Sequence, residues 1–563
     1  MHGSRLYETG SPSQDQLHRL ESGSVSARLR TLIAGAAGMV LAFGIAELTH
    51  GLYELVPSVF VALSQLVIRL TPGNFATQAI ETLGGADVPI LMVSMVVSAL
   101  AVAGFLAGLS LRSPGAALAG VGVLAAVALV AAFAQPFVAS VATILTIVAA
   151  LGAGAAVTWF LLGVSGLRAS GPVPSIDPQK PGGEPQPQSV RSREAHSAGR
   201  IAVSRRNFLM LSGSATVAGL AAAGVGRTLS GEGTQEASSP ASSKLPETSS
   251  KALPLPPPEA SIDVPGMPPL ITPAEDFYLI DTALTSPRIN VDRWTLKVKG
   301  AVDNPIEFTY RDLLSMSTRE ADITLSCVSN EVGGGLISNG RWTGVLLSDV
   351  LAEAGVSRDK ISSASEQLVG RSVDGWTAGF KTGIALDGRE ALVAFGLNGD
   401  ELPVKHGYPV RLVVPGLYGY VSATKWLTEI ELTDWDFDAY WIQRTWSKEG
   451  PIKTQSRIDT VKDGERLSAG TIQVGGIAWA PHRGIERVEI STDGGETWNN
   501  ARLADQLDID TWRQWIYDWE AKPGNHTLKA RATDGEGETQ TDKETPPHPS
   551  GATGYHTIKV NVA

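Results

Sequence analysis

Cysteine is almost absent from this sequence. The 563 residues include a single one, Cys327. A chain with one thiol cannot form an internal disulfide, so its stability must come from packed cores. The sequence also has no C-x-x-C-H haem-attachment motif and no set of cysteines for an iron–sulfur cluster. These absences exclude a covalently attached c-type haem and a cysteine-bound cluster as resident groups.

An excess of positive charge is missing as well. The chain has 46 lysines and arginines against 57 aspartates and glutamates, which gives a net charge of −11. Because binding to nucleic acid needs a basic surface, this balance argues against a nucleic-acid partner. No internal repeat with the period of a solenoid is apparent.

Long apolar runs are concentrated in the first third of the chain. Four stretches are each long enough, at about 20 residues, to span the hydrocarbon core of a bilayer: 30–49, 88–111, 115–134 and 138–167. They are rich in small residues, which suits close packing of helices in lipid. A shorter apolar run at 55–70 predicts an interfacial or re-entrant segment, so we expect four spans plus this segment.

The arginines outside these runs indicate the orientation. One group lies between residues 5 and 30, and a second begins at Arg168. Four spans place both groups on the cytoplasmic side, whereas five would place the second group outside. Glu47, His50 and Glu54 fall at the outer end of the first span. They are interfacial polar residues or, alternatively, a proton or quinone site.

A proline- and glycine-rich linker at 168–203 leads to a mildly apolar stretch at 204–227. This stretch begins with residues 204–209, "SRRNFL", an order that resembles the S-R-R-x-F-L of a twin-arginine export signal. A stop-transfer arginine pair before an ordinary anchor is the alternative. Because twin-arginine export carries folded proteins, often with a cofactor inserted, we expect a cofactor in the part that follows.

The composition becomes that of globular domains after a second spacer at 228–260. From 261 to 435, β-type runs such as "YPVRLVV" alternate with helical pieces such as "SDVLAEAGV", which predicts an α+β domain. From 436 to 563 the pattern is all-β and predicts an immunoglobulin-like sandwich. The predicted fold is therefore multidomain: a cytoplasmic tail at 1–28, an all-α transmembrane bundle at 29–167, and these two domains beyond the linker and tether.

Three long stretches resemble one family. They are, in order, "LSCVSNEVGGGLISNGRWTGVLLSDVLAEAGV" (325–356), "LVAFGLNGDELPVKHGYPVRLVVPGLYGYVSATKWLTEIEL" (392–432) and "GIAWAPHRGIERVEISTDGGETWNNARL" (476–503). Together they resemble the sulfite oxidase superfamily of molybdopterin-dependent oxidoreductases, of a membrane-anchored bacterial type, over 261–563. The resemblance implies a molybdenum–molybdopterin cofactor, two-electron oxygen-atom transfer, and a C-terminal domain that forms homodimers.

The resemblance also assigns residues to the cofactor. Cys327 would be the thiolate on molybdenum, a soft ligand suited to a sulfur-bound metal; a buried, inert cysteine is the alternative. The glycines at 333–335 are expected to let the chain pass close to the cofactor. The implied contacts to the pterin and its phosphate are Tyr278, Asp281, Thr282, Asp374, His406, Gly407, Arg411 and Lys425.

The sequence departs from the family pattern around the expected substrate pocket. Ile280 stands where the family has an arginine, Glu331 and Val332 replace two more, and Phe395 replaces an active-site tyrosine. Fewer cations and an added carboxylate make a sulfate-like anion a poor substrate. We therefore expect a small S-oxide, N-oxide or other weakly charged substrate. Asn330 and Glu331 are the catalytic candidates beside Cys327, and Arg341 and Trp376 are expected in the wall.

The electron path is the remaining question at this stage. Without a resident haem or cluster, electrons must be exchanged with a separate partner protein or with quinone at the membrane. The predicted location is the cell membrane, with several spans and an extracytoplasmic catalytic part. The alternatives are a sulfite oxidase proper, a non-catalytic cofactor-binding or membrane scaffold, and a transporter with a sensing domain, against which the scarcity of charges within the spans argues.

Overall fold

The computed structural model describes residues 14–53, 55–71, 75, 87–135, 138–167, 205–230, 245, 252–287 and 289–563. The expected linker at 168–203, Ser204 of the twin-arginine motif and most of the tether lie outside these residues. The chain forms two compact units. The first comprises Met1–Thr71 and Ala79–Ala237, and the second comprises Pro72–Gln78 and Ser238–Ala563.

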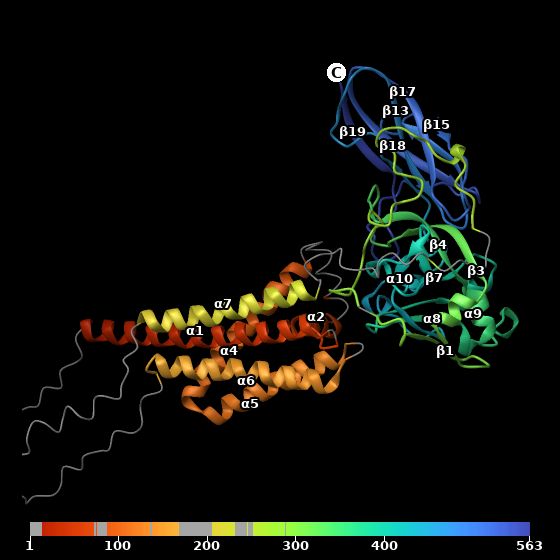
Figure 1. Ribbon diagram of the computed structural model, residues 1–563. Helices are drawn as coiled ribbons and strands as arrows, with labels where there is room; N and C mark the ends of the chain where they lie inside the picture. Colours follow the sequence, from red (N-terminus) through yellow and green to blue (C-terminus); the bar gives the residue numbers. More distant parts are fainter. Residues whose placement is uncertain are drawn as a thin grey trace, which may run out of the picture. The chain divides into compact units, whose positions relative to one another are not determined.

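The first unit is built from apolar helices (Figure 1). They are α1 (Gln14–Leu52), α2 (Val59–Leu70), α4 (Asp87–Arg112), α5 (Pro114–Phe133), α6 (Ser140–Val164) and α7 (Arg205–Leu229). Among the described helices, all of these except α2 are long and apolar enough to cross a membrane. The four stretches expected to be spans form α1, α4, α5 and α6, and the shorter run at 55–70 forms α2.

Small residues bring the helices of this unit close together. A Cβ atom at Gly35 on α1 would lie 2.5 Å from the carbonyl oxygen of Ala103 on α4, and one at Gly154 on α6 would lie 2.6 Å from that of Gly38. Such backbone approaches are possible only because glycine has no side chain. The buried side chains between these helices are likewise mostly alanine and leucine.

The first half of the second unit contains two sheets. One has the strand order β2-β1-β10-β5-β6, and the other has the order β3-β4-β7-β8 with β9 paired to β7. The strands are β1 (Thr295–Gly300), β2 (Ile306–Thr309), β3 (Thr318–Ser326), β4 (Ile337–Leu346), β5 (Gln367–Ser372), β6 (Thr377–Lys381), β7 (Leu392–Leu397), β8 (Asp400–Glu401), β9 (Arg411–Val413) and β10 (Leu427–Thr433). Three short helices join them: α8 (Tyr310–Ser315), α9 (Leu347–Glu353) and α10 (Gly419–Ser422).

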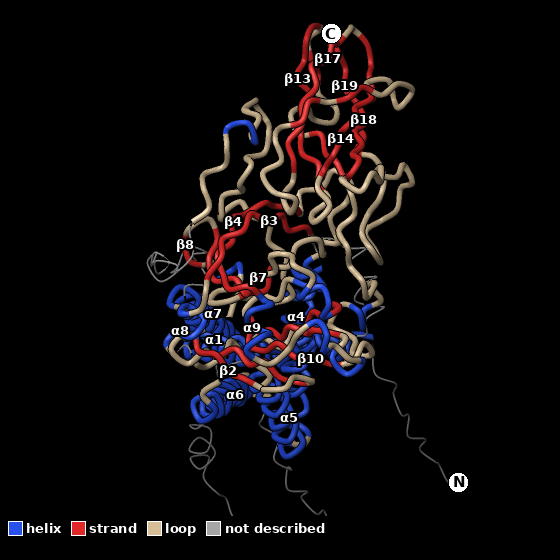
Figure 2. The backbone as a smooth tube through the Cα atoms, turned by 90° about the vertical axis from the view of Figure 1, so that its right-hand side faces the viewer, coloured by secondary structure: helices blue, strands red, loops and turns tan. Residues whose placement is uncertain are grey.

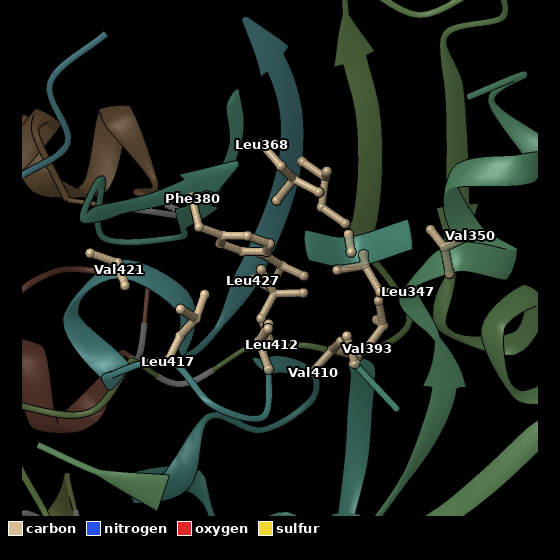
Figure 3. Packing of buried hydrophobic residues seen from close by; sticks show 14 of the residues in the cluster. Leu347, Val350, Leu368, Phe380, Val393, Val410, Leu412, Leu417, Val421 and Leu427 are labelled. Atoms are coloured by element: carbon tan, nitrogen blue, oxygen red, sulfur yellow. The ribbon is translucent and has the colours of Figure 1, made fainter. Parts of the chain in front are cut away.

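A large hydrophobic core lies between these elements (Figure 3). Leu368 from β5, Phe380 from β6, Val393 from β7, Leu412 from β9 and Leu427 from β10 are at most 3 % exposed and converge there. Five strands from both sheets therefore contribute to one core. This part of the unit is the mixed α+β domain that the sequence predicted.

The C-terminal half of the unit is all-β, and its strands are drawn in red in Figure 2. One sheet has the order β11-β13-β17-β16 and the other the order β12-β19-β18-β14-β15. The strands are β11 (Gln455–Ile458), β12 (Arg466–Leu467), β13 (Gly470–Trp479), β14 (Ile485–Ser491), β15 (Asn499–Asn500), β16 (Arg502–Leu503), β17 (Arg513–Ala521), β18 (Gly524–Asp534) and β19 (His556–Val562). Val474 and Trp515 from one sheet share a buried core with Ile490, Leu528 and Ile558 from the other. The strands thus form a two-layer sandwich; its immunoglobulin-like topology remains a prediction.

Candidate functional site

Cys327 lies directly after β3, where the chain turns into β4. The strands are paired up to Ser326 and Ile337. Beyond that pair, the backbone N–H of Cys327 donates to the carbonyl of Leu336 at 2.9 Å, and the N–H of Asn330 donates to the carbonyl of Cys327 at 3.1 Å. Backbone hydrogen bonds therefore fix the cysteine at the start of the loop that joins β3 and β4.

The surroundings of the thiol are suited to a thiolate. Cys327 is only 9 % exposed, and burial raises the pKa of its thiol. The backbone N–H and the hydroxyl of Ser329, the nearby Lys425 cation and the backbone N–H of Val328 act in the opposite direction and favour the ionised form. A buried sulfur with this set of donors fits a thiolate that binds a metal, since a bound metal keeps a coordinating thiol deprotonated.

Asn330 spans the same turn. Its side-chain oxygen accepts a hydrogen bond from the N–H of Leu336 at 2.8 Å. Its side-chain nitrogen is buried, and it has no hydrogen-bond partner among the described residues. Buried amide nitrogens are rarely left unpaired in native proteins. This nitrogen is therefore an unsatisfied buried donor three residues after Cys327.

Two glycines of the turn contact the C-terminal sandwich. Gly333 has a positive φ of 78°, and a Cβ atom there would collide with the ring of His556 on β19. The carbonyl of Gly334 accepts from Arg457 Nη1 at 2.7 Å, and Arg457 in turn pairs with Asp459. Gly333 therefore makes room for the C-terminal sandwich, which holds the cysteine turn, whereas a Cβ atom at Gly335 would have nothing within 4 Å. That the glycines let the chain pass close to the cofactor stays a prediction.

Arg411, the first residue of β9, is a buried cation. It is 4 % exposed, and burial lowers the pKa of its guanidinium to about 10. Its Nη1 donates to the carbonyl of His406 at 3.1 Å, and the guanidinium lies 5.0 Å from the centre of the Trp342 ring. No described carboxylate forms an ion pair with it. Because a buried charge without a partner is costly, this position calls for an anionic ligand.

His406 and Gly407 form the bend before β9. His406 is 1 % exposed, and burial together with the cations of Arg411 and Lys425 lowers its pKa to about 3. The imidazole is therefore neutral, and its Nε2 lies 3.1 Å from the carbonyl of Ala274, to which it must donate. Gly407 has a φ of +113°, and a Cβ atom there would lie 3.0 Å from Cβ of Arg411 and 3.2 Å from Cα of Lys425.

Lys425 joins three segments that are distant in the sequence. Its Nζ pairs with Asp281 at 2.7 Å and donates to the carbonyl of Lys405 at 3.1 Å. Asp374 lies in the turn between β5 and β6. In this turn the N–H of Val373 donates to the carbonyl of Trp426. The charge of Asp374 acts on the pKa of Lys425. Burial lowers that pKa and Asp281 opposes the shift. Thr282 follows Asp281 and is half-buried.

Two tyrosines lie close to Cys327. Burial raises the pKa of Tyr278; the charge of Cys327 adds to the shift and that of Arg411 opposes it. Burial also raises the pKa of Tyr418 to about 12, again with a contribution from Cys327. Tyr278 was predicted as a cofactor contact. Tyr418, Arg457 and His556 were not singled out, although Tyr418 lies in the glycine-rich turn "VPGLYGY".

Two predicted features of the pocket wall need correction. Arg341 forms an ion pair with Asp322, its register partner on β3, at 2.8 Å, and lines a separate cavity of about 330 Å³ with Leu253 and Glu390. Phe395 is fully buried in the hydrophobic core and meets Tyr310 edge-on. Arg341 thus lies away from the cysteine turn because a carboxylate faces it across the hairpin, and Phe395 is a core residue.

The two remaining predicted residues are Glu331 and Trp376. Glu331 is exposed at the surface of the cysteine turn. Trp376 is half-buried, and its indole nitrogen is buried without a hydrogen-bond partner among the described residues. Its backbone N–H donates to Asp374 at 3.0 Å. Trp376 therefore lies on the turn that carries Asp374.

The assembled residues fit the cofactor that the sequence implied. Cys327 supplies a buried thiolate donor, and Arg411 and Lys425 supply fixed cations for a phosphate. Asn330 supplies an unpaired buried N–H group. Soft sulfur, fixed cations and free donors are the groups that a metal held by a pterin dithiolene with a phosphate tail requires.

Comparisons with known families agree with this donor set. The oxidoreductase molybdopterin binding domain matches residues 283–441, and the Mo-co oxidoreductase dimerisation domain matches residues 448–559. The mitochondrial sulfite oxidase of Homo sapiens is 30% identical over 273 residues, which cover 41% of this chain and 49% of that protein. That of Rattus norvegicus is 31% identical over 271 residues, with the same coverage.

Two further relatives extend the comparison. The NADH nitrate reductase of Spinacia oleracea is 28% identical over 271 residues, covering 39% of this chain and 29% of that one. Among solved structures, the sulfane dehydrogenase SoxCD from Paracoccus pantotrophus has 24% identity and a TM-score of 0.46, covering 54% of this chain and 84% of that one. The chain spans about half the length of the sulfite oxidases that it matches.

Proposed function

Because the chain belongs to the sulfite oxidase superfamily of molybdopterin-dependent oxidoreductases, we propose that it transfers an oxygen atom to or from a small, weakly charged substrate in a two-electron reaction. One observation carries this proposal. A buried thiol with N–H donors around it and a buried arginine without a described ion-pair partner both act on the pKa of one phenol, that of Tyr278. When bound, the molybdenum cofactor supplies the two-electron chemistry.

The chain's own residues would bind the cofactor and orient the substrate. Cys327 would hold the metal, and Arg411 with Lys425 would hold the phosphate end of the pterin. Neutral His406 keeps its proton on Nε2 and fixes the bend from which Arg411 points inward. The free amide nitrogen of Asn330 would donate a hydrogen bond to an oxygen atom of the substrate. For an S-oxide, the balanced reaction consumes two electrons and two protons and yields the sulfide and water.

The character of the pocket supports a weakly charged substrate. Ile280 is 46 % exposed where the family has an arginine, and the exposed residue at the cysteine turn is a carboxylate, Glu331. Arg341, a further cation in the sequence nearby, is neutralised by Asp322. An anion such as sulfite would gain little from these groups, so an S-oxide or N-oxide is favoured over sulfite.

The setting of the enzyme is part of the proposal. Helices α1, α4, α5, α6 and α7 would anchor it in the cell membrane, with residues 261–435 and 436–563 as extracytoplasmic domains. The C-terminal sandwich would form a homodimer. Electrons would come from a separate partner protein or from membrane quinone, because the sequence contains no haem-attachment motif or cluster-binding cysteines.

The first test is the metal content of the full-length protein beside a Cys327→Ser variant. We expect roughly one molybdenum and one pterin per chain, and loss or alteration of the Mo(V) EPR signal in the variant, since a serine oxygen is a harder ligand. Because Cys327 is the only thiol, the extent of alkylation reports on whether this thiol is protected. The loaded protein should resist the reagent under native conditions. A folded protein without molybdenum would contradict the proposal.

The substrate class is tested with the loaded enzyme. Methionine sulfoxide, dimethyl sulfoxide and trimethylamine N-oxide are offered with a reduced dye, and sulfite is offered with an oxidised acceptor. Turnover of at least one neutral oxide, at a rate well above that of sulfite, is expected. Faster sulfite oxidation would instead identify a sulfite oxidase proper, and a loaded enzyme inert toward all four would contradict the proposed substrate class.

A further inference from the structure

Helix α7 has one buried face with a regular spacing. Starting from Phe208, residues that are buried or half-buried recur four and three positions apart along the helix: Phe208, Ser212, Ala215, Gly219, Ala222 and Gly226. This alternation is the pattern by which one helix packs along another over several turns. The side chains on the other face are apolar and open: Leu209 is 57 %, Val217 65 % and Leu220 61 % exposed.

The buried face packs directly against the backbone of α1 (Figure 1). A Cβ atom at Gly219 would lie 2.5 Å from the carbonyl oxygen of Val40 and 2.9 Å from Cα of Leu41. One at Gly226 would collide with the carbonyl of Glu47. The contact is reciprocal, because Cβ atoms at Gly44 and Gly51 of α1 would collide with the carbonyls of Gly219 and Gly226. Glycine on both helices is what permits this approach.

The phenylalanine of the "SRRNFL" stretch belongs to the core of the helical unit. Phe208 is 3 % exposed and packs in one cluster with Ala34 and Ala37 of α1 and with Leu161 and Leu162 of α6. A segment that is only recognised for export and then cut away has no need to fill a core. Phe208 therefore has a structural role in the helical unit, in addition to any role in export.

The direction of α7 provides an independent argument. Gly44 faces Gly219 and Gly51 faces Gly226, so α7 runs parallel to α1. Helices α4 and α6 run antiparallel to α1: Leu32 meets Gly104 while Gly35 meets Ala103, and Ala34 accepts from Thr158 while Ala42 meets Gly154. A chain that crosses a membrane five times through α1, α4, α5, α6 and α7 must have its first and last spans parallel, as observed.

We propose that α7 is retained in the mature protein as a fifth span, seated on α1 through the paired glycines, and is not removed as an export signal. This rests on the membrane placement proposed above. Five crossings would put the first residue of α7 on the same side of the membrane as the first residue of α1, and the last residue of α7 on the opposite side. The paired arginines and the catalytic unit thus belong to one continuous polypeptide in the working enzyme.

Retention is tested with the full-length chain carrying one tag at each end. After membrane extraction, both tags are expected on a single polypeptide, and its N-terminal and C-terminal peptides should be found in the same band by mass spectrometry. Two fragments, each with one tag and with the break near the end of α7, would overturn the proposal. The result does not depend on cofactor content or on turnover.

The glycine contact is tested by a matched pair of variants. Gly219→Leu places a side chain against α1, whereas Gly224→Leu places the same side chain on the same helix where nothing lies within 4 Å. A protease site is inserted in the 168–203 linker of the full-length protein, which is cut after extraction. The two pieces should co-elute for the wild type and for Gly224→Leu, and separate for Gly219→Leu.

The outcomes are separable from those of the catalytic proposal. Pieces that separate in the wild type, or equal behaviour of the two variants, would overturn the contact between α1 and α7 whatever the molybdenum content. Conversely, a protein that lacks molybdenum but co-elutes after cleavage would leave the fifth span standing and contradict only the catalytic assignment. Molybdenum content and cleavage are therefore measured on the same preparation.

Discussion

Arg411 shows most clearly what a single residue contributes to the site. It is buried in the second unit, stacks on Trp342, and has no described carboxylate partner. The charge of Asp281 acts on it only from a distance, without an ion pair. A buried cation without a direct ion-pair partner costs several kcal/mol, in order of magnitude. The bound phosphate would remove that cost. Arg411 would therefore lower the stability of the cofactor-free protein and raise its affinity for an anion.

Arg411→Met should therefore have opposite effects on the stability of the cofactor-free and the cofactor-loaded protein. Methionine keeps the packing against Trp342 but removes the charge. We expect the cofactor-free variant to be more stable than the cofactor-free wild type, by about 1–3 kcal/mol, and the variant to bind little cofactor. Denaturant unfolding of protein made with and without cofactor supply measures both. Equal destabilisation of the two forms would show that Arg411 serves packing alone.

Among the structural elements, the hairpin of β3 and β4 positions the cysteine, and the C-terminal sandwich holds the tip of that hairpin. Arg457 of β11 donates to the carbonyl of Gly334, and His556 of β19 packs against Gly333. The loop before β17 also pins β3, because the N–H of Thr324 donates to the carbonyl of Asp510 and its hydroxyl accepts from Trp512. The sandwich therefore supports the cysteine turn, in addition to the homodimer that it is proposed to form.

One substitution at Arg457 and one at Asp459 separate the support of the cysteine turn from the pairing of the two charges. Arg457→Met leaves Asp459 buried without its partner and should cost about 3–5 kcal/mol. Adding Asp459→Leu removes the orphan charge and should restore most of that stability. In the double variant the carbonyl of Gly334 still lacks its donor, so an altered Mo(V) EPR signal should persist. A double variant with wild-type stability and a wild-type signal would exclude the supporting role.

On the scale of the whole molecule, acid should weaken the second unit through its buried histidines. Burial and the nearby Arg457 lower the pKa of His556 to about 4, below the usual value of about 6.5. Between these two pH values the unfolded chain binds the extra proton, so this group's contribution to stability is present above pH 6.5 and is lost as pH falls toward 4. The slope is at most about 1.4 kcal/mol per pH unit.

Comparison of the wild type with His556→Gln isolates this effect. The difference in unfolding free energy between them should shrink as the pH is lowered from 6.5 to 4. Burial raises the pKa of Asp510 to about 6, a shift of the opposite sign, and it acts equally in both proteins. A difference that stays constant over this range would show that His556 does not titrate as its burial implies.

Much of the molecule's plan could be predicted from the sequence, because its strongest patterns are local. Apolar runs predicted the helices α1, α2, α4, α5 and α6, and the motifs around Cys327, Arg411 and Lys425 predicted residues whose charges act on one another in the structure. Residues joined through tertiary contacts were harder to predict. The partner of Arg341 is a strand neighbour 19 positions away, and the neighbour of Gly333 is His556, so neither follows from spacing along the chain.

The single thiol also makes this protein unusually easy to label. Cys327 is 9 % exposed, so a second cysteine introduced where nothing lies within 4 Å, such as at Gly122 on α5 or at Gly383 in the second unit, would be the reactive one. Fluorophores or spin labels could then be placed one at a time without first deleting native cysteines. Pairs of such labels would give the distance between the helical unit and the second unit in solution.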